Sequence, residues 1–197
     1  MALAAMITTI SCFNLGESDD ERFYGFFQRD AKVMQDMGLP VYWLGRAFTA
    51  GGLTFRGPYA PEFGGAVEDG QLFVGYLSRL EGTPFEGSTI SVNMTIYSPA
   101  AWQLAKDRIL NPRVLSTEGE VTRRTVTVKG HQAQVISVPF ASRPVNVVSL
   151  ILETEPVVVV AEARSNHAPD GTELSIFMKN PDLFVQVIDQ NLRPYPE

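Results

Sequence analysis

Hydrophobic and polar residues are arranged in short blocks that predict many strands and few helices. Seven segments are apolar, rich in β-branched and aromatic residues, and bounded by Gly, Pro or polar turns, which is typical of buried strands. They cover residues 39–45, 71–78, 88–97, 121–128, 132–138, 146–154 and 157–163. In the second half the segments are joined by very short links, which permit antiparallel neighbours but no parallel crossover. We therefore expect residues 121–163 to form consecutive antiparallel strands.

Three segments have the pattern of helices. The first covers residues 19–37 and begins at a capping box made by Ser18 and Glu21. The other two begin at Pro99 and Pro181, each preceded by a residue whose side chain can cap the first turn. An aromatic and methionine stripe returns to one face of the first helix, and we expect it to pack on the sheet.

The order of these elements predicts an α+β fold. Helices precede, interrupt and follow the strands instead of alternating with them. We expect a mainly antiparallel sheet of about seven strands with three helices packed on one face. A β-sandwich with peripheral helices is the alternative. The length favours one domain over residues 19–197.

Charge argues against nucleic acid as a partner. The net charge is -6 and the pI is about 5.0, so no general positive field attracts phosphate groups. The basic residues that cluster in the sequence, Arg123, Arg124 and Lys129, surround one predicted hairpin, and such a cluster is typical of a solvated surface.

The single cysteine, Cys12, lies in an apolar N-terminal run. Residues 2–15 carry no charge. The run is shorter than the roughly 20 residues that cross a bilayer, but it has the length of the apolar region of a signal peptide. Alternatively, it is a buried N-terminal strand or helix that carries an inert thiol.

Residues 8–12, with the sequence Thr-Thr-Ile-Ser-Cys, resemble a bacterial lipobox. Thr9 stands where that pattern usually has Leu, and no Lys or Arg precedes the apolar run. The resemblance implies that residues 1–11 are a signal segment, that Cys12 carries a lipid, and that residues 12–18 are a tether. It also implies a place at the extracytoplasmic face of the cell membrane, with the cytoplasm as the alternative.

Residues 120–195 resemble the extracytoplasmic domains of uncharacterised bacterial lipoproteins and anti-sigma regulators. The likeness depends on the segment VTVKGHQAQV, a valine-rich strand and a final helix ending in NLRPY. It implies an antiparallel meander and supplies no catalytic residue.

Motifs of catalysis are missing from the sequence. It contains no G-x-S-x-G, no P-loop, no G-x-G-x-x-G and no H-E-x-x-H. Its two histidines, His131 and His167, lie in turn-like segments. We expect neither a metal nor a cofactor.

The stretch at residues 49–70 is rich in Gly and Pro and holds several aromatic residues. Long irregular loops are often functional. One hypothesis is a loop in which Phe55, Arg56, Tyr59 and Phe63 are ligand-binding candidates, with the three rings converging on one side of a cleft around a small apolar or planar ligand. The sequence favours the plainer alternative, in which these rings cover one edge of the core.

These observations favour a non-catalytic lipoprotein that acts as a binding or accessory subunit. Its expected partners are the membrane, through the lipid anchor, and a protein or a small apolar ligand. A structural subunit of a membrane-attached assembly is one alternative. The other is an enzyme with an unrecognised site, which a deep pocket holding His131 or His167 beside a carboxylate would favour.

Overall fold

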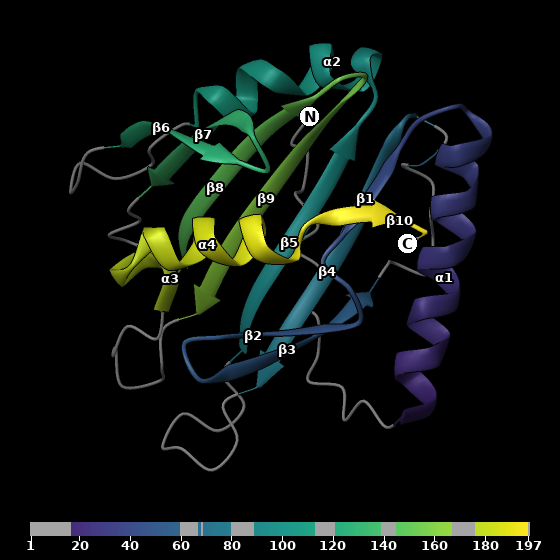
Figure 1. The fold of residues 1–197 in the computed structure, drawn as a ribbon, viewed down its shortest axis with the longest axis horizontal. Helices are drawn as coiled ribbons and strands as arrows, with labels where there is room; N and C mark the ends of the chain where they lie inside the picture. The colour runs from purple at the N-terminus through teal and green to yellow at the C-terminus, as the bar shows by residue number, and fades with distance from the viewer. Residues whose placement is uncertain are drawn as a thin grey trace, which may run out of the picture.

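The computed structural model of the protein describes residues 17–59, 67, 69–79, 89–112, 121–138, 145–166 and 176–196. Figure 1 shows their arrangement. The helices in these ranges are α1 (Glu17–Asp36), α2 (Pro99–Leu110), α3 (Ile176–Lys179) and α4 (Pro181–Asn191). The strands are β1 (Val41–Trp43), β2 (Ala47–Ala50), β3 (Leu53–Tyr59), β4 (Gln71–Arg79), β5 (Thr89–Tyr97), β6 (Thr122–Val128), β7 (His131–Val138), β8 (Val145–Thr154), β9 (Val157–Asn166) and β10 (Arg193–Tyr195).

The main sheet has the strand order β2-β3-β4-β5-β9-β8-β7-β6, and every neighbouring pair is antiparallel. Strands β1 and β10 form a separate antiparallel pair. The predicted α+β class is therefore confirmed. The prediction for residues 121–163 is confirmed as well, because β6, β7, β8 and β9 are consecutive antiparallel neighbours.

We call the side of the sheet that faces the larger core the inner face. Its side chains occupy alternate positions of the strands, as the two-residue period of a strand requires. On β5 these are Ile90, Val92, Met94 and Ile96, all of them buried. Helix α1 adds Phe27, Ala31 and Met34, and helix α4 adds Phe184, Val187 and Ile188. Burying each large side chain contributes about 1.5–3 kcal/mol, so this face holds most of the stabilisation.

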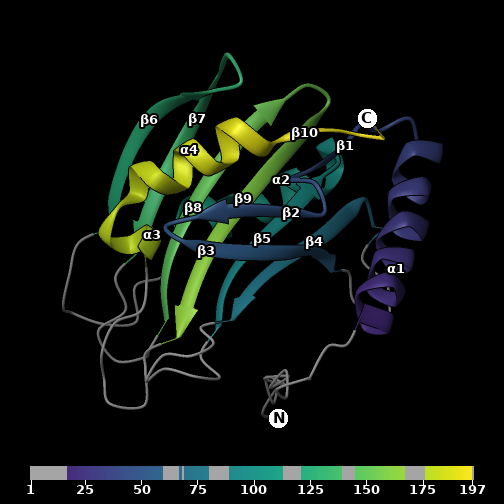
Figure 2. The same cartoon turned by 60° about the horizontal axis from the view of Figure 1, so that its bottom comes forward.

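Helix α4 connects the two edges of the curled sheet across the inner face (Figures 1 and 2). At the β2–β3 turn, Gly51 lies against α3 and α4, so a Cβ there would be 2.9 Å from Ile176 Cδ1. At the opposite edge, Arg124 of β6 forms an ion pair of 2.6 Å with Asp182. The backbone N–H of Lys129 also donates to Asp189 Oδ1 at 2.6 Å. The inner core is thus enclosed between the sheet and α4.

Tyr76 links the small β1–β10 pair to the main sheet. Its side chain is fully buried, and its hydroxyl accepts a hydrogen bond of 2.8 Å from the backbone N–H of Leu44. Burial raises the pKa of Tyr76, because a phenolate would lose its hydration. Within the predicted strand at residues 39–45, Val41, Trp43 and Leu44 are buried, although β1 pairs with β10 and not with the main sheet.

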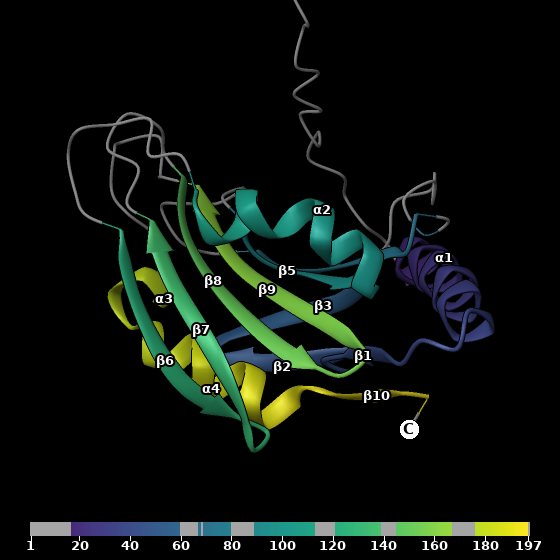
Figure 3. The ribbon, with the colours of Figure 1, turned by 90° about the horizontal axis from the view of Figure 1, so that it is seen from above.

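The opposite side, which we call the outer face, is partly covered by α2 (Figure 3). Ser98 caps this helix, because its hydroxyl accepts a hydrogen bond of 3.2 Å from the N–H of Ala101. The helix buries Ala101, Trp102 and Ala105 against the outer face. The expectation that all helices pack on one face was therefore wrong for α2. The physical reason is that this end of the outer face is apolar and is stabilised when α2 buries it. Its apolar residues include Tyr97, Ile136, Ile151 and Val158.

The prediction of an irregular loop at residues 49–70 was wrong for its first half. Strands β2 and β3 form a hairpin in which Ala50 pairs with Leu53. Gly51 and Gly52 have φ values of 55° and 80°, the left-handed region that a tight two-residue hairpin turn requires. The pair of glycines is thus a turn between two strands. Residues 60–66 and 68 lie outside the described residues.

Candidate functional site

The residues predicted to bind a ligand do not share one environment. Phe55 is 0% exposed and stacks on Phe48 with a centroid distance of 4.9 Å, so it belongs to the inner core. Arg56, the next residue on β3, is exposed. The ring of Tyr59 meets Phe23 of α1 edge to face at 5.6 Å. The described rings therefore do not converge on one cleft, and for Phe55 the alternative reading holds, in which the ring packs in the core.

Two further predicted site residues, Cys12 and Phe63, lie outside the described residues. His167 lies outside them as well, and His131 is exposed at the start of β7. Among the described residues there is no group of three or more His, Cys, Asp and Glu side chains that could hold a metal ion. In the same part of the chain, no helix is long and apolar enough to cross a membrane.

A concave site lies on the outer face, beside the C-terminal end of α2. We call it the sheet cleft. Its cavity volume is about 450 Å³. It is lined by Phe73, Thr95, Tyr97, Arg108, Ile109, Pro112, Val138, Ser149, Val160, Glu162 and Arg164. All of these residues except Pro112 come from β4, β5, α2, β7, β8 and β9.

The floor of the sheet cleft is built from outer-face positions of neighbouring strands. On β9 the outer positions change from Val158 and Val160 to Glu162 and Arg164 along the strand. The antiparallel register sets Glu162 between Asn93 of β5 and Ser149 of β8. Directly paired residues on one face of a sheet are close enough to interact. The strand register therefore brings together polar residues that are far apart in the sequence.

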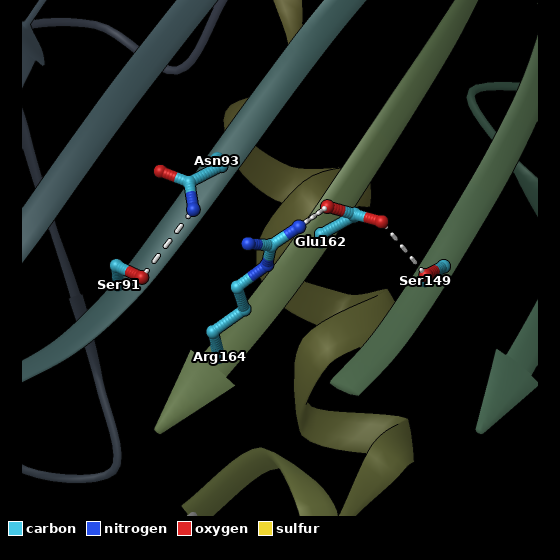
Figure 4. A network of polar contacts seen from close by, with 5 residues as sticks. All are labelled: Ser91, Asn93, Ser149, Glu162 and Arg164. Atoms are coloured by element: carbon cyan, nitrogen blue, oxygen red, sulfur yellow. Dashed lines mark hydrogen bonds and ion pairs between the residues drawn. The ribbon is translucent and has the colours of Figure 1, made fainter. Parts of the chain in front are cut away.

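A polar network runs across this floor (Figure 4). Arg164 Nη2 donates to Glu162 Oε2 at 2.7 Å, and the hydroxyl of Ser149 donates to Glu162 Oε1 at 3.4 Å. On β5, Asn93 Nδ2 donates to Ser91 Oγ at 3.4 Å. The Glu162 side chain is 27% exposed and that of Arg164 is 51% exposed. The ion pair is thus partly shielded from water, which strengthens it relative to a fully exposed pair.

Phe73 and its neighbour Gly75 shape one side of the sheet cleft. The Phe73 ring is 40% exposed, which is unusual for a large apolar side chain in a sheet. A Cβ on Gly75 would lie 3.5 Å from both Phe73 Cε1 and Asn93 Oδ1. Glycine at this position therefore leaves the space between the ring and the polar floor unfilled.

The opposite side of the sheet cleft combines an apolar wall with a second arginine. Ile109, Pro112, Val138 and Val160 form the apolar part. Burial raises the pKa of Tyr97, the nearby Glu162 carboxylate raises it further, and hydrogen bonding from Thr95 together with the charge of Arg108 opposes the shift. Tyr97 lines the cleft together with Arg108 and Glu162, whose charges shift its pKa in opposite directions. Its position connects the α2 end of the cleft to the polar floor.

A second, smaller cavity of about 310 Å³ lies between the β2–β3 turn and α4. Its lining has no charged residue and consists of Thr49, Ala50, Gly51, Gly52, Leu183, Gln186, Val187 and Gln190. Ligand sites usually place a few convergent polar or charged groups in an apolar surround. Both cavities combine polar and apolar side chains, but the sheet cleft is the larger of the two and its lining also holds charged groups, so we assign the candidate site to the sheet cleft.

Sequence reasoning identified the strands of this site but not the site itself. The useful pattern was present in the predicted strand at 157–163, where Glu162 interrupts a valine run. A charged residue at an otherwise buried position of a central strand points to a functional or solvated patch. Ser149 and Asn93 interrupt their own predicted strands in the same way.

Comparisons with known proteins add little to this geometry. No model of a known protein family matches the chain, and no curated protein matches it. Among solved structures, the chain is similar to PA94 from Pseudomonas aeruginosa, a protein of unknown function, with a TM-score of 0.41 and 14% sequence identity. That match covers 77% of this chain and 97% of the other. A likeness at this level supports no conclusion about function.

Proposed function

We propose that this protein is a non-catalytic binding or accessory protein that takes a small ligand in the sheet cleft. We further propose that a lipid on Cys12 holds it at the outer face of the cell membrane. The observation that carries the proposal is the sheet cleft, whose volume of about 450 Å³ falls within the usual range for small-molecule sites. The cleft joins an apolar wall to a few placed polar groups, which is the usual composition of such sites.

The membrane location rests on the sequence. The apolar run ends at Ser11 and Cys12, as a lipobox does, and the polar Asn14 and Gly16 lie in the short stretch before α1, which would be the tether. A tether leaves the domain free of the bilayer, so the sheet cleft stays accessible from the aqueous side. Location and binding are separate parts of the proposal, and they need separate tests.

The binding part is tested by thermal shift with a library of soluble small molecules. A ligand at a hundred times its Kd adds about 2.7 kcal/mol, which raises the Tm by about 5–10 °C for a chain of this size. The comparison is a Thr95→Trp variant, in which an indole fills the floor of the cleft. We expect some compounds to stabilise the native chain and not the variant.

Phe73→Ala provides a second variant in case Thr95→Trp does not fold, which circular dichroism will show. Phe73 is partly exposed, so its removal leaves the core intact. If every compound that stabilises the native chain stabilises both cleft variants equally, the sheet cleft is not the binding site. The absence of any stabilising compound would overturn the binding function.

The membrane part is tested by growth with a radioactive fatty acid, followed by fractionation. We expect the native chain to be labelled and to sediment with membranes, and Cys12→Ser to be unlabelled and released or unprocessed. Its Tm should match that of the native domain, because the thiol lies outside the core in this proposal. An unlabelled native chain in the soluble fraction, destabilised by Cys12→Ser, would support the alternative of a buried N-terminal segment.

A further inference from the structure

Charge is distributed unequally among the described residues that line the sheet cleft. They include two arginines, Arg108 and Arg164, and one acid, Glu162. The whole chain has a net charge of -6, so this lining is locally positive on an acidic protein. A locally positive cleft attracts anions and repels cations.

The single acid of the lining is already engaged. Glu162 and Arg164 occupy successive outer-face positions of β9, and their contact is 2.7 Å. A guanidinium has five N–H donors in a rigid plane. The contact with Glu162 uses one N–H donor of the Arg164 guanidinium and helps to fix the orientation of its plane. The other N–H donors remain for a ligand. A ligand anion that meets a guanidinium already held in position loses less affinity to side-chain ordering.

The remaining lining is suited to an apolar body. Val138 and Val160 lie beside the polar floor, and Ile109 and Pro112 continue the wall from α2. Across the cavity, the exposed ring of Phe73 offers a flat apolar surface. The cavity volume of about 450 Å³ exceeds what an inorganic anion needs and accommodates a small organic molecule.

From this juxtaposition we infer that the sheet cleft binds an amphipathic organic anion. Its carboxylate or phosphate accepts hydrogen bonds from Arg164 and Arg108, and its apolar body lies against the wall at Val138, Val160 and Ile109. This inference rests on the proposed function and names the ligand class for the same site. A cation would face two guanidiniums and one carboxylate that Arg164 already engages, and a neutral amphiphile would gain hydrogen bonds from the guanidiniums but no ion pair.

The first experiment compares probes that share a ten-carbon chain and differ in their head group. Decanoate, decyl phosphate, 1-decanol and decyltrimethylammonium are titrated by calorimetry at concentrations below those at which each aggregates. We expect at least one anionic probe to bind about tenfold or more tightly than the alcohol, because charge-assisted hydrogen bonds are the stronger ones. The cationic probe should show the weakest binding.

Inorganic phosphate and acetate are titrated as head groups without a chain. We expect them to bind at least about tenfold more weakly than decyl phosphate and decanoate, because they leave the apolar wall uncovered. If the free anions bind as tightly as the amphiphiles, the site is a simple anion site and the inference fails. Binding seen only where a probe aggregates would also overturn it.

The second experiment removes one guanidinium. Arg164→Gln should weaken the anionic probe about tenfold or more and leave the alcohol unchanged. The matched control is Arg124→Gln, which removes the same charge from β6, where the arginine pairs with Asp182 on the inner side. Arg164→Lys keeps the charge without the planar fork. Its affinity for the anionic probe should therefore fall between that of the native chain and that of Arg164→Gln. Equal loss in the Arg164 and Arg124 variants would contradict the inference.

These outcomes separate the inference from the proposed function. If the library yields ligands that Thr95→Trp excludes and those ligands are neutral or cationic, the anion inference fails while the binding function stands. If neither the library nor the anionic probes distinguish the native chain from Thr95→Trp, both fail.

Discussion

The inner and outer faces of the main sheet differ in how their side chains change along a strand. On β9 the inner positions from Val157 to Ala163 are apolar and buried, namely Val157, Val159, Ala161 and Ala163. The outer positions of the same strand begin with Val158 and Val160 and continue with Glu162 and Arg164. Because both rows belong to one strand, secondary structure alone does not account for the difference. What differs is the cover, which α1 and α4 provide on the inner side and α2 provides only in part on the outer side.

This contrast separates stability from recognition. A buried side chain of the inner face has no contact with solvent, so its substitution acts through packing and cavities. A side chain in the uncovered half of the outer face contacts water, and its substitution should act mainly on a ligand.

The largest effect is expected for Phe55→Ala on the inner face. Removing a fully buried ring that stacks on Phe48 should lower the free energy of unfolding by about 3–5 kcal/mol. Phe73→Ala, which removes the same ring from the outer face, should lower it by less than about 1 kcal/mol. Urea unfolding followed by fluorescence measures both. Equal losses would mean that Phe73 is a core residue and that the two faces do not differ as described.

The next effect concerns Tyr76, the buried polar group of the inner face. Tyr76→Phe leaves the N–H of Leu44 without its acceptor and should cost about 1–3 kcal/mol at neutral pH. Burial raises the pKa of Tyr76 in the folded chain above its ordinary value near 10. Below pH 10 the tyrosine is protonated in both states and adds no pH dependence.

Above pH 10 the unfolded chain loses the Tyr76 proton and the folded chain keeps it, so stability falls as pH rises, by at most about 1.4 kcal/mol per pH unit. Tyr76→Phe should remove the contribution of Tyr76 to this slope. Unfolding curves between pH 9 and 11 measure it. Tyr97→Phe is the outer-face control and should change the slope less, because the Tyr97 side chain borders the open cleft. An unchanged slope in Tyr76→Phe would show that its hydroxyl is not protected.

Most of the fold could be predicted because its strands carry strong local patterns. The predicted segments 71–78 and 88–97 correspond to β4 and β5 within a residue or two, since alternating or continuous apolar runs mark them. The β2–β3 hairpin was missed because Gly51 and Gly52 were read as loop residues and not as a tight turn. Strand β10 has three residues, which is too short for a periodic pattern.

The site could be predicted only in part, because it depends on register. Alternation shows that Glu162 and Arg164 share one face of their strand, but it does not show which face α2 covers. The pairing of Glu162 with Ser149 follows from the two-residue link between β8 and β9, but the pairing with Asn93 joins segments far apart in the sequence, and no local pattern fixes that alignment. The ligand residues that the sequence did nominate came from the misread loop, and Phe55 among them packs in the core.

A further effect on the free energy of unfolding is expected at Gly57, where β3 packs closely against β4. A Cβ on Gly57 would lie 2.5 Å from the carbonyl oxygen of Gly75 and 2.6 Å from Tyr76 Cδ1. Gly57→Ala should therefore cost about 1–3 kcal/mol by overpacking. Gly25→Ala on the exposed side of α1 meets no atom within 4 Å and should stabilise the chain by about 0.5–1 kcal/mol. Thermal unfolding of the two variants measures these changes. If both substitutions change the Tm in the same direction, the close approach of β3 to β4 is contradicted.

The smallest effect is expected for the ion pair that joins β6 to α4 at the rim of the inner core. Arg124 and Asp182 are 41% and 79% exposed, so water and salt screen their attraction. Arg124→Ala should lower the free energy of unfolding by less than about 1 kcal/mol, and this loss should vanish in 1 M salt. Phe184→Ala removes a fully buried ring of α4 and should cost about 3–5 kcal/mol at either salt concentration. If Arg124→Ala costs as much as Phe184→Ala, α4 is held at the rim by charge, and burial on the inner face is not what encloses the core.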